Sequence, residues 1–283
     1  MKRLFAIAIS SLFLLAGCNL VTYYYDNSEM YTKYTEPVGF VIYDADLKSI
    51  NVDWISGEVI IKKGDTSEFT ETNILGSYLP CYYYLNGLDL NIKYCASGTS
   101  SIKSGHTKKK LEITCPASVE TIKIKTVSAD YTVEMSGVND LVLDTVSGDG
   151  NIKVDYIDHL DLDSTSGDLT LEAGTLNSAT MDTVSGDVKV DVTNTKQFDF
   201  DSTSGALKLI VRESALIDKI KFSAVSGGAK MYFDGLRGYN LDFSSTSGDK
   251  TLNFKDGPDT LPKFDIEFDS TSGDLLVDLV SAL

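Results

Sequence analysis

A Ser-Gly pair that returns at near-constant spacing constrains the fold of this 283-residue chain more than any other feature. Four of the pairs follow one another every 19 residues, and three more follow at intervals of 22, 21 and 25. The glycines of these pairs are Gly148, Gly167, Gly186, Gly205, Gly227, Gly248 and Gly273. A repeat period in this range is typical of solenoids, in which each repeat stacks on the one before it.

Apolar and polar residues alternate on both sides of each Ser-Gly pair. In the repeat from Leu160 to Leu171, leucines stand at every second position before and after the glycine. Such a period of two predicts β-strands with one buried face and one wet face. When the repeats are aligned on their glycines, Phe200, Phe222 and Phe243 share one inward column. We therefore expect these rings to pile up inside the stack.

The length of the repeat fixes the kind of solenoid. Nineteen residues hold two short strands and two corners, but they are too few for a strand–helix–strand unit. We predict an all-β fold, a single-chain parallel β-helix with coils of about 19–25 residues. We place the repeated glycines at the corners, because glycine has no Cβ and takes positive φ without strain.

The last residues of the chain, 275–283, are mostly apolar and form no charged cap. A solenoid needs a cap because its final coil leaves strand edges unpaired. Two expectations follow. Either these residues fold over the end of the stack as a lid, or they dock on a second copy or another envelope component, which would give end-to-end self-association.

The chain begins with a positive segment, residues 1–3, followed by a short apolar segment, residues 4–14, and by Leu15-Ala16-Gly17-Cys18. This start resembles the bacterial lipoprotein signal peptide with its lipobox. The resemblance implies that residues 1–17 are removed, that Cys18 is modified by lipid including palmitate, and that the lipid attaches the protein to the membrane. The alternative is an ordinary secretory signal.

Four segments follow one another along the sequence. Residues 1–17 are the signal peptide, 18–39 the lipidated cysteine and a flexible tether, 40–126 a β-rich opening region and 127–283 the regular repeats. The opening region already contains a strand–corner–strand pattern and, at Asn86-Gly87, a hairpin turn signal. No linker separates the last two segments, so residues 40–283 are expected to form one continuous domain.

The mature chain is strongly acidic. Removal of the signal leaves 23 basic against 41 acidic residues, a net charge of −18. Such a charge repels nucleic acid, so we expect no nucleic-acid partner. The run Lys108-Lys109-Lys110 stands next to a strand and is interpreted as a solvated loop end.

Three cysteines remain after Cys18: Cys81, Cys95 and Cys115. An odd number in an exported chain allows one disulfide and leaves its pairing open. The strands that end at Cys95 and Cys115 end alike, which makes this pair our first choice. Three thiols without a Cys-x-x-Cys spacing do not predict a metal site, and we expect no cofactor.

Aspartates recur in two outward columns. The column with Asp163, Asp182 and Asp201 recurs in nearly every coil instead of clustering once, which favours a wet strand face over a catalytic site. We predict no catalytic residue. A second column follows the glycines and is interrupted at Ala206 and Gly228. Its carboxylates either accept hydrogen bonds from the corner amides, which we expect, or bind calcium.

The strand at residues 54–59, the strand at residues 111–116 and the serial Ser-Gly-Asp repeats together resemble a known family. It is the bacterial β-strand-repeat putative adhesin family of unknown function, which is related to the head-GIN putative auto-transporter adhesins. The resemblance covers roughly residues 40–283. It implies a β-helical protein exposed on the cell envelope, without established catalysis.

We therefore expect an extracytoplasmic surface protein that is lipid-anchored to a bacterial membrane, of a monoderm or an outer-membrane host. It would serve as an adhesin or as a structural or binding module with a protein or glycan ligand. One alternative is an envelope-stress or signalling accessory that binds a membrane sensor. A third hypothesis is a polysaccharide-active β-helix enzyme.

Overall fold

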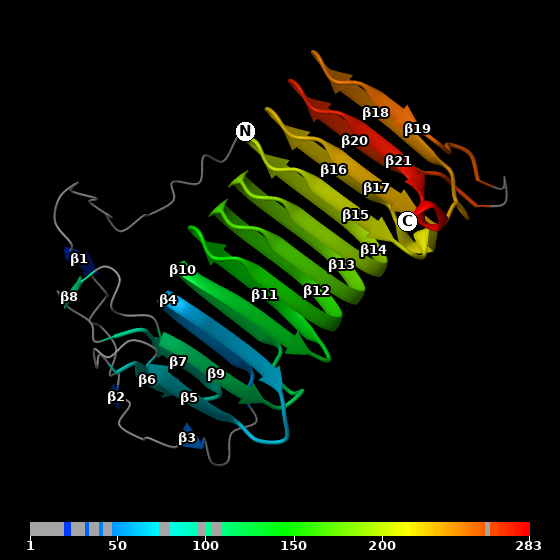
Figure 1. Ribbon diagram of the computed structural model, residues 1–283. Coiled ribbons are helices and arrows are strands. Elements are labelled where there is room, and N and C mark those ends of the chain that lie inside the picture. Colours follow the sequence, from blue (N-terminus) through cyan, green and yellow to red (C-terminus); the bar gives the residue numbers. More distant parts are fainter. Residues whose placement is uncertain are drawn as a thin grey trace.

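Long parallel strands, each bonded to its equivalent in the next coil, dominate the structure (Figure 1). This computed structural model describes residues 47–73, 80–95, 109–257 and 261–283, together with the backbone of strands at 20–23, 32–33, 40–41 and 100–103. The central strands are β10 (Thr121–Met135), β11 (Val138–Thr145), β12 (Gly150–Ser166), β13 (Leu169–Ser185) and β14 (Val188–Ser202). The fold is all-β and is the parallel β-solenoid that the repeats predict.

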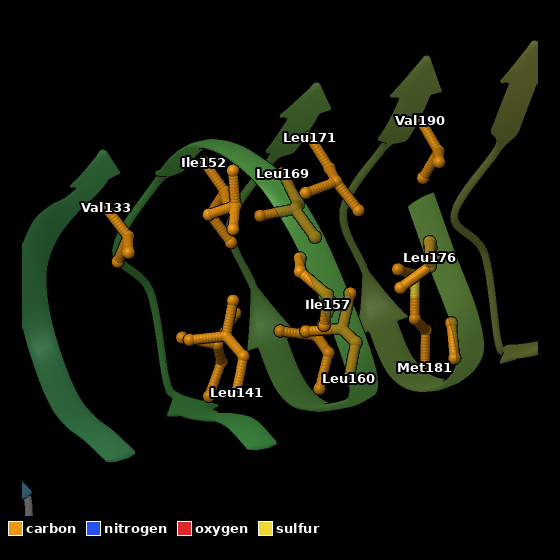
Figure 2. Packing of buried hydrophobic residues seen from close by; sticks show 14 of the residues in the cluster. Val133, Leu141, Ile152, Ile157, Leu160, Leu169, Leu171, Leu176, Met181 and Val190 are labelled. Carbon is orange, nitrogen blue, oxygen red and sulfur yellow. The ribbon is translucent and has the colours of Figure 1, made fainter. Parts of the chain in front are cut away.

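The repeat period appears directly as strand register. Leu141 lies beside Leu160, which lies beside Ala179, each 19 residues after the last. Figure 2 shows this layer facing a second one, in which Val133, Ile152, Leu171 and Val190 follow one another across the coils. Because alternate residues point inward, both layers bury unbroken apolar columns, and the core runs the length of the stack.

The coils at the C-terminal end of the chain do not stack in the order of the sequence (Figure 1). The last coil lies between two earlier coils, because β20 pairs with both β16 and β18 while β21 pairs with both β17 and β19. The strands concerned are β15 (Leu207–Val211), β16 (Lys219–Ala224), β17 (Ala229–Phe233), β18 (Tyr239–Ser245), β19 (Lys250–Leu252), β20 (Phe264–Ser270) and β21 (Leu275–Leu279).

The stacked phenylalanine rings follow the same order of coils. The ring of Phe222 stacks on Phe200 at 5.5 Å and on Phe268 at 4.8 Å, and Phe268 stacks in turn on Phe243 at 5.2 Å. The predicted pile is confirmed, but the prediction that consecutive windings touch is wrong at this end. The identical inward pattern of every coil lets the final coil fit between two others.

The apolar C-terminal residues are consequently not the end of the stack. Leu275 and Val277 on β21 are almost completely buried between neighbouring coils. This corrects the expectation that residues 275–283 form a lid or a docking end. The unpaired edge belongs instead to β18 and β19, each of which has one parallel neighbour among the described strands.

The opening region shows the same inversion. The first long strand, β4 (Ser49–Lys63), pairs with β10 on one side and with both β7 (Asp89–Lys93) and β9 (Lys109–Cys115) on the other. Antiparallel strands then close this end of the stack: β5 (Glu68–Asn73) on β9 and β6 (Tyr82–Asn86) on β7. Two short strands extend this cap, β2 (Thr32–Lys33) on β6 and β3 (Phe40–Val41) on β5.

The remaining elements are short. Strand β1 (Leu20–Tyr23) pairs with β8 (Ser100–Lys103), and two 3₁₀ turns, η1 (Ser214–Leu216) and η2 (Val280–Ala282), follow strands late in the chain. Within the described ranges, no helix is long and apolar enough to cross a membrane.

Candidate functional site

The repeated glycines lie at the corners, where neighbouring coils approach most closely. A Cβ on Gly167 or Gly186 would stand 2.3 Å from the carbonyl oxygen of the corner glycine in the preceding coil. Among the described glycines, positive φ occurs only at Gly57, Gly87 and Gly235. The physical reason that we gave for the corner glycines, positive φ, is therefore wrong. They are needed because only hydrogen fits between stacked corners.

Serines and aspartates beside the glycines bond several of the consecutive corners together. The Ser166 hydroxyl donates to the carbonyl of Val146 in the preceding coil at 3.3 Å. The carboxylate of Asp149 accepts the amide N–H of Asp168 at 2.9 Å, and Asp168 accepts that of Asp187 at 2.9 Å. The Ser-Gly-Asp motif therefore connects neighbouring corners, and we call it the clasp. Its serine hydroxyl donates to the preceding coil, its glycine lets the corners touch, and its aspartate carboxylate accepts an amide N–H of the next coil.

This clasp explains the corner aspartates without an ion. Their partners are amides of the next coil, whereas the sequence suggested amides of their own corner. In the part of the chain that the structure describes, no three His, Cys, Asp or Glu side chains are grouped so as to hold a metal.

The other acidic column runs along the strands before the corners. Asp144, Asp163, Asp182 and Asp201 occupy equivalent positions in four successive coils. Burial, followed by the neighbouring carboxylates, raises the pKa of Asp163 and of Asp182. Lys221 ends the row, with its Nζ 3.0 Å from Asp199 and 3.3 Å from Asp201. The column forms a polar outer face in which Asp144 pairs with Lys125 and Asp201 with Lys221, whereas Asp163 and Asp182 form no ion pair within the described ranges.

A groove of about 940 Å³ lies along the strands that follow the corners. Lys189, Lys208 and Lys230 line it from β14, β15 and β17 and occupy equivalent positions in successive coils. The sequence analysis missed this basic column, because its members are 19 and 22 residues apart. Each lysine stands three residues after a corner glycine, and alignment of that position across the repeats would have found them.

The Cys95–Cys115 disulfide that we favoured is not formed. The Cys115 thiol is free and lies 3.6 Å from the Met135 sulfur. Cys115 ends β9 opposite Lys63, whereas Cys95 follows β7, whose last residue lies opposite Asp53. The two cysteines therefore lie near different halves of β4, whereas a disulfide needs Cα atoms within about 7 Å.

Lys109 is not a solvated loop residue either. Its side chain is 1% exposed and forms a 2.6 Å ion pair with Glu71, which is also buried. Its Nζ also contacts the Tyr94 carbonyl and lies 3.9 Å from the Tyr94 ring centroid. Burial lowers the pKa of Lys109, and the charge of Glu71 opposes that effect. The pair fastens β5 of the cap to β9.

The lipidation residue predicted from the sequence, Cys18, lies outside the described residues. The remaining features define a class: a parallel β-solenoid whose coils are clasped by Ser-Gly-Asp corners. Residues 47–260 match the family described as Toastrack DUF4097. The chain belongs to this family.

Comparison with solved structures finds similar chains at low sequence identity. A putative adhesin from Bacteroides fragilis is 14% identical, with 85% of this chain and 96% of that chain covered and a TM-score of 0.51. A putative lipid binding protein from Parabacteroides distasonis is 12% identical, with 88% and 98% covered and a TM-score of 0.44. The first comparison establishes a common fold. No curated protein matches the chain.

Proposed function

We propose that this protein is a lipid-anchored, extracytoplasmic binding module of the bacterial cell envelope. The observation that carries the proposal is the lipobox Leu15-Ala16-Gly17-Cys18, which directly follows a positive segment and an apolar one. Membership of the Toastrack family agrees with this role, and the Bacteroides fragilis protein that shares the fold is described as a putative adhesin.

The arrangement of the solenoid supports binding over catalysis. Polar groups of the strands and corners form hydrogen bonds between coils, as those of the serines and aspartates illustrate. The acidic column recurs in four successive coils instead of clustering at one place, whereas acid–base chemistry on a glycan needs one pair of carboxyl groups held together. The outer faces of the coils, and above all the groove, are available for binding a ligand.

The anchor is tested by labelling growing cells with a palmitate analogue. The wild-type chain and the control Cys81→Ser should carry the label and sediment with membranes. Cys18→Ser should lose the label and leave the membrane fraction, because the anchor depends on the Cys18 thiol alone. Label retained by Cys18→Ser, or an unlabelled wild-type protein in the soluble fraction, would overturn the proposal.

The end-to-end self-association expected from the sequence is proposed for the edge of β18 and β19. On this edge the backbone groups have no parallel neighbour among the described strands, and half-buried Phe243 lies there, 5.0 Å from Lys250 Nζ. A second copy could add its own edge there. Light scattering should show the mass rising towards a dimer with concentration, and a constant monomer mass would refute this contact.

A further inference from the structure

Three lysines in the corner groove form the one stacked basic column found among the described residues. Lys189 and Lys230 are exposed and Lys208 is half-buried, and each lies beside the next in the strand register. In the described ranges none of the three forms an ion pair, whereas Lys221 and Lys219 each bind a carboxylate. Like charges at neighbouring positions repel each other, so a ligand that neutralises them would be favoured.

Lys208 and Lys230 lack the acidic neighbours found elsewhere along the coils, whereas Lys189 stands between Asp187, which also lines the groove, and Asp191. The positions two residues before and after Lys208 and Lys230 are all uncharged, and the two that follow the lysines are buried: Ala206, Ile210, Gly228 and Tyr232. Asp191, which flanks Lys189, is held by Arg212 through two hydrogen bonds of 2.8 and 2.7 Å. The interruption of the corner aspartates at Ala206 and Gly228 thus coincides with Lys208 and Lys230.

Carboxylates limit the length of the basic column. Asp168 lines the groove on one side of the three lysine coils, and Asp274 lines it on the other. Adjacent coils are about 4.8 Å apart, so the first and last lysines start roughly 10 Å from each other. A long polyanion would continue onto these carboxylates, whereas a compact anion with two or three charges would not.

We propose that this column binds a compact phosphate compound that carries two or three negative charges. Ammonium groups bind phosphate as mobile point charges with three donors each. A peptide could not add as a strand here, because the backbones of β14, β15 and β17 are bonded to parallel strands on both sides. The inference rests on the proposed binding role and gives that role a ligand class.

The test is calorimetric titration of the full chain, held in detergent, with inorganic tripolyphosphate as the probe. Lys189→Gln, Lys208→Gln and Lys230→Gln combined should weaken binding about tenfold or more. The control combines Lys63→Gln, Lys123→Gln and Lys153→Gln. It removes the same charge from exposed lysines outside the column and should bind almost as the wild type does.

A second variant keeps every lysine. Ala206→Asp restores the missing corner carboxylate beside Lys208, and it should also weaken tripolyphosphate binding severalfold, with a thermal midpoint no lower than that of the wild type. Absence of wild-type binding, or equal losses in the two triple variants, would overturn the proposal.

Both soluble compounds and lipid headgroups carry such phosphates, and competition separates these two sources. Displacement of tripolyphosphate by vesicles of phosphatidic acid in phosphatidylcholine would support a lipid headgroup as the ligand, and unchanged tripolyphosphate binding would support a soluble phosphate. Because the titration does not use the anchor, its failure would remove this ligand and leave the palmitate test of surface location standing.

Discussion

Substitution of a corner glycine by alanine tests the clasp most severely. In Gly186→Ala the new Cβ would lie 2.3 Å from the Gly167 carbonyl oxygen, so the corner must open by at least about 0.7 Å to reach 3.0 Å. Overpacking of this kind costs about 1–3 kcal/mol. The shift also strains the bond from the Asp187 amide to Asp168, worth about 1 kcal/mol. We expect a total loss of about 2–4 kcal/mol.

The matched control is Gly137→Ala. The nearest atom to a Cβ at Gly137 is 3.5 Å away, on Tyr156, and φ there is not positive. Alanine at such a site stabilises by about 0.4–1 kcal/mol, because it restricts the unfolded chain. Urea unfolding with the slope held constant gives both free energies. A loss below about 1 kcal/mol for Gly186→Ala would show that the corners are not in contact and would refute the reasoning.

Three further predictions concern the columns. Phe268→Ala, in the inserted coil, should cost about 3–5 kcal/mol in urea unfolding, whereas Phe243→Ala, half-buried at the edge, should cost less than half as much. Asp187→Ala should cost about 1 kcal/mol by the same method, because the Ala206 amide loses its acceptor. Asp182→Asn should raise the thermal midpoint at pH 7 and stabilise the fold by about 0.5 kcal/mol, a small value because the carboxylate is only partly shielded from solvent.

The pH dependence of the Asp182 effect has a definite sign. Its pKa is raised in the folded state, so its charged form costs stability above that pKa. The cost disappears as pH falls through the raised value towards the ordinary 3.8. The stability advantage of Asp182→Asn should therefore vanish at about pH 3.5, which is close to that ordinary pKa. A constant advantage at all pH values, or the same advantage from the control Asp155→Asn, would contradict this explanation.

For the column predictions, other outcomes would be equally informative. An equal or larger cost for Phe243→Ala than for Phe268→Ala would mean that Phe243 lies inside the stack and that the coils follow sequence order. An unchanged stability of Asp187→Ala would mean that the aspartate clasp is replaced by water without loss, as surface hydrogen bonds often are.

The sequence predicted what depends on the local period. Two-residue alternation and a spacing of 19 determine which side chains point inward, and Leu141, Leu160 and Met181 lie inside as expected. The role of the corner aspartates was half right: they do bond backbone amides, but across coils. Contact between corners, and not φ, explains the glycines, because the closeness of the next coil is a property of stacking.

The order of the end coils could not be predicted, because the coils present interchangeable inward columns. Ile220, Ile266 and Leu241 are chemically alike and lie in register in that order. The basic column and the Lys109–Glu71 pair were missed for a related reason. Their members are distant in sequence and meet only through register, so single segments gave no signal.

Both ends of the described solenoid share one topological feature. The first long strand, β4, and the last strands, β20 and β21, each lie between two other coils. Strands that are paired on both sides lose more contacts on opening than an edge strand does. Fraying is therefore expected at β18 and β19 before β20 and β21.

The stacking order is the central claim, since the phenylalanine pile, the buried C-terminal strand and the composition of the groove all depend on it. Oxidation of paired cysteine variants measures it directly. Ser223 and Asp269 are outward neighbours in the strand register, and Asp269 separates Ser223 from Ser244. Neighbouring coils about 4.8 Å apart suit a disulfide, whereas coils about 9.6 Å apart do not. Ser223→Cys with Asp269→Cys should crosslink within one chain, and Ser223→Cys with Ser244→Cys should not. The reverse result would contradict the account.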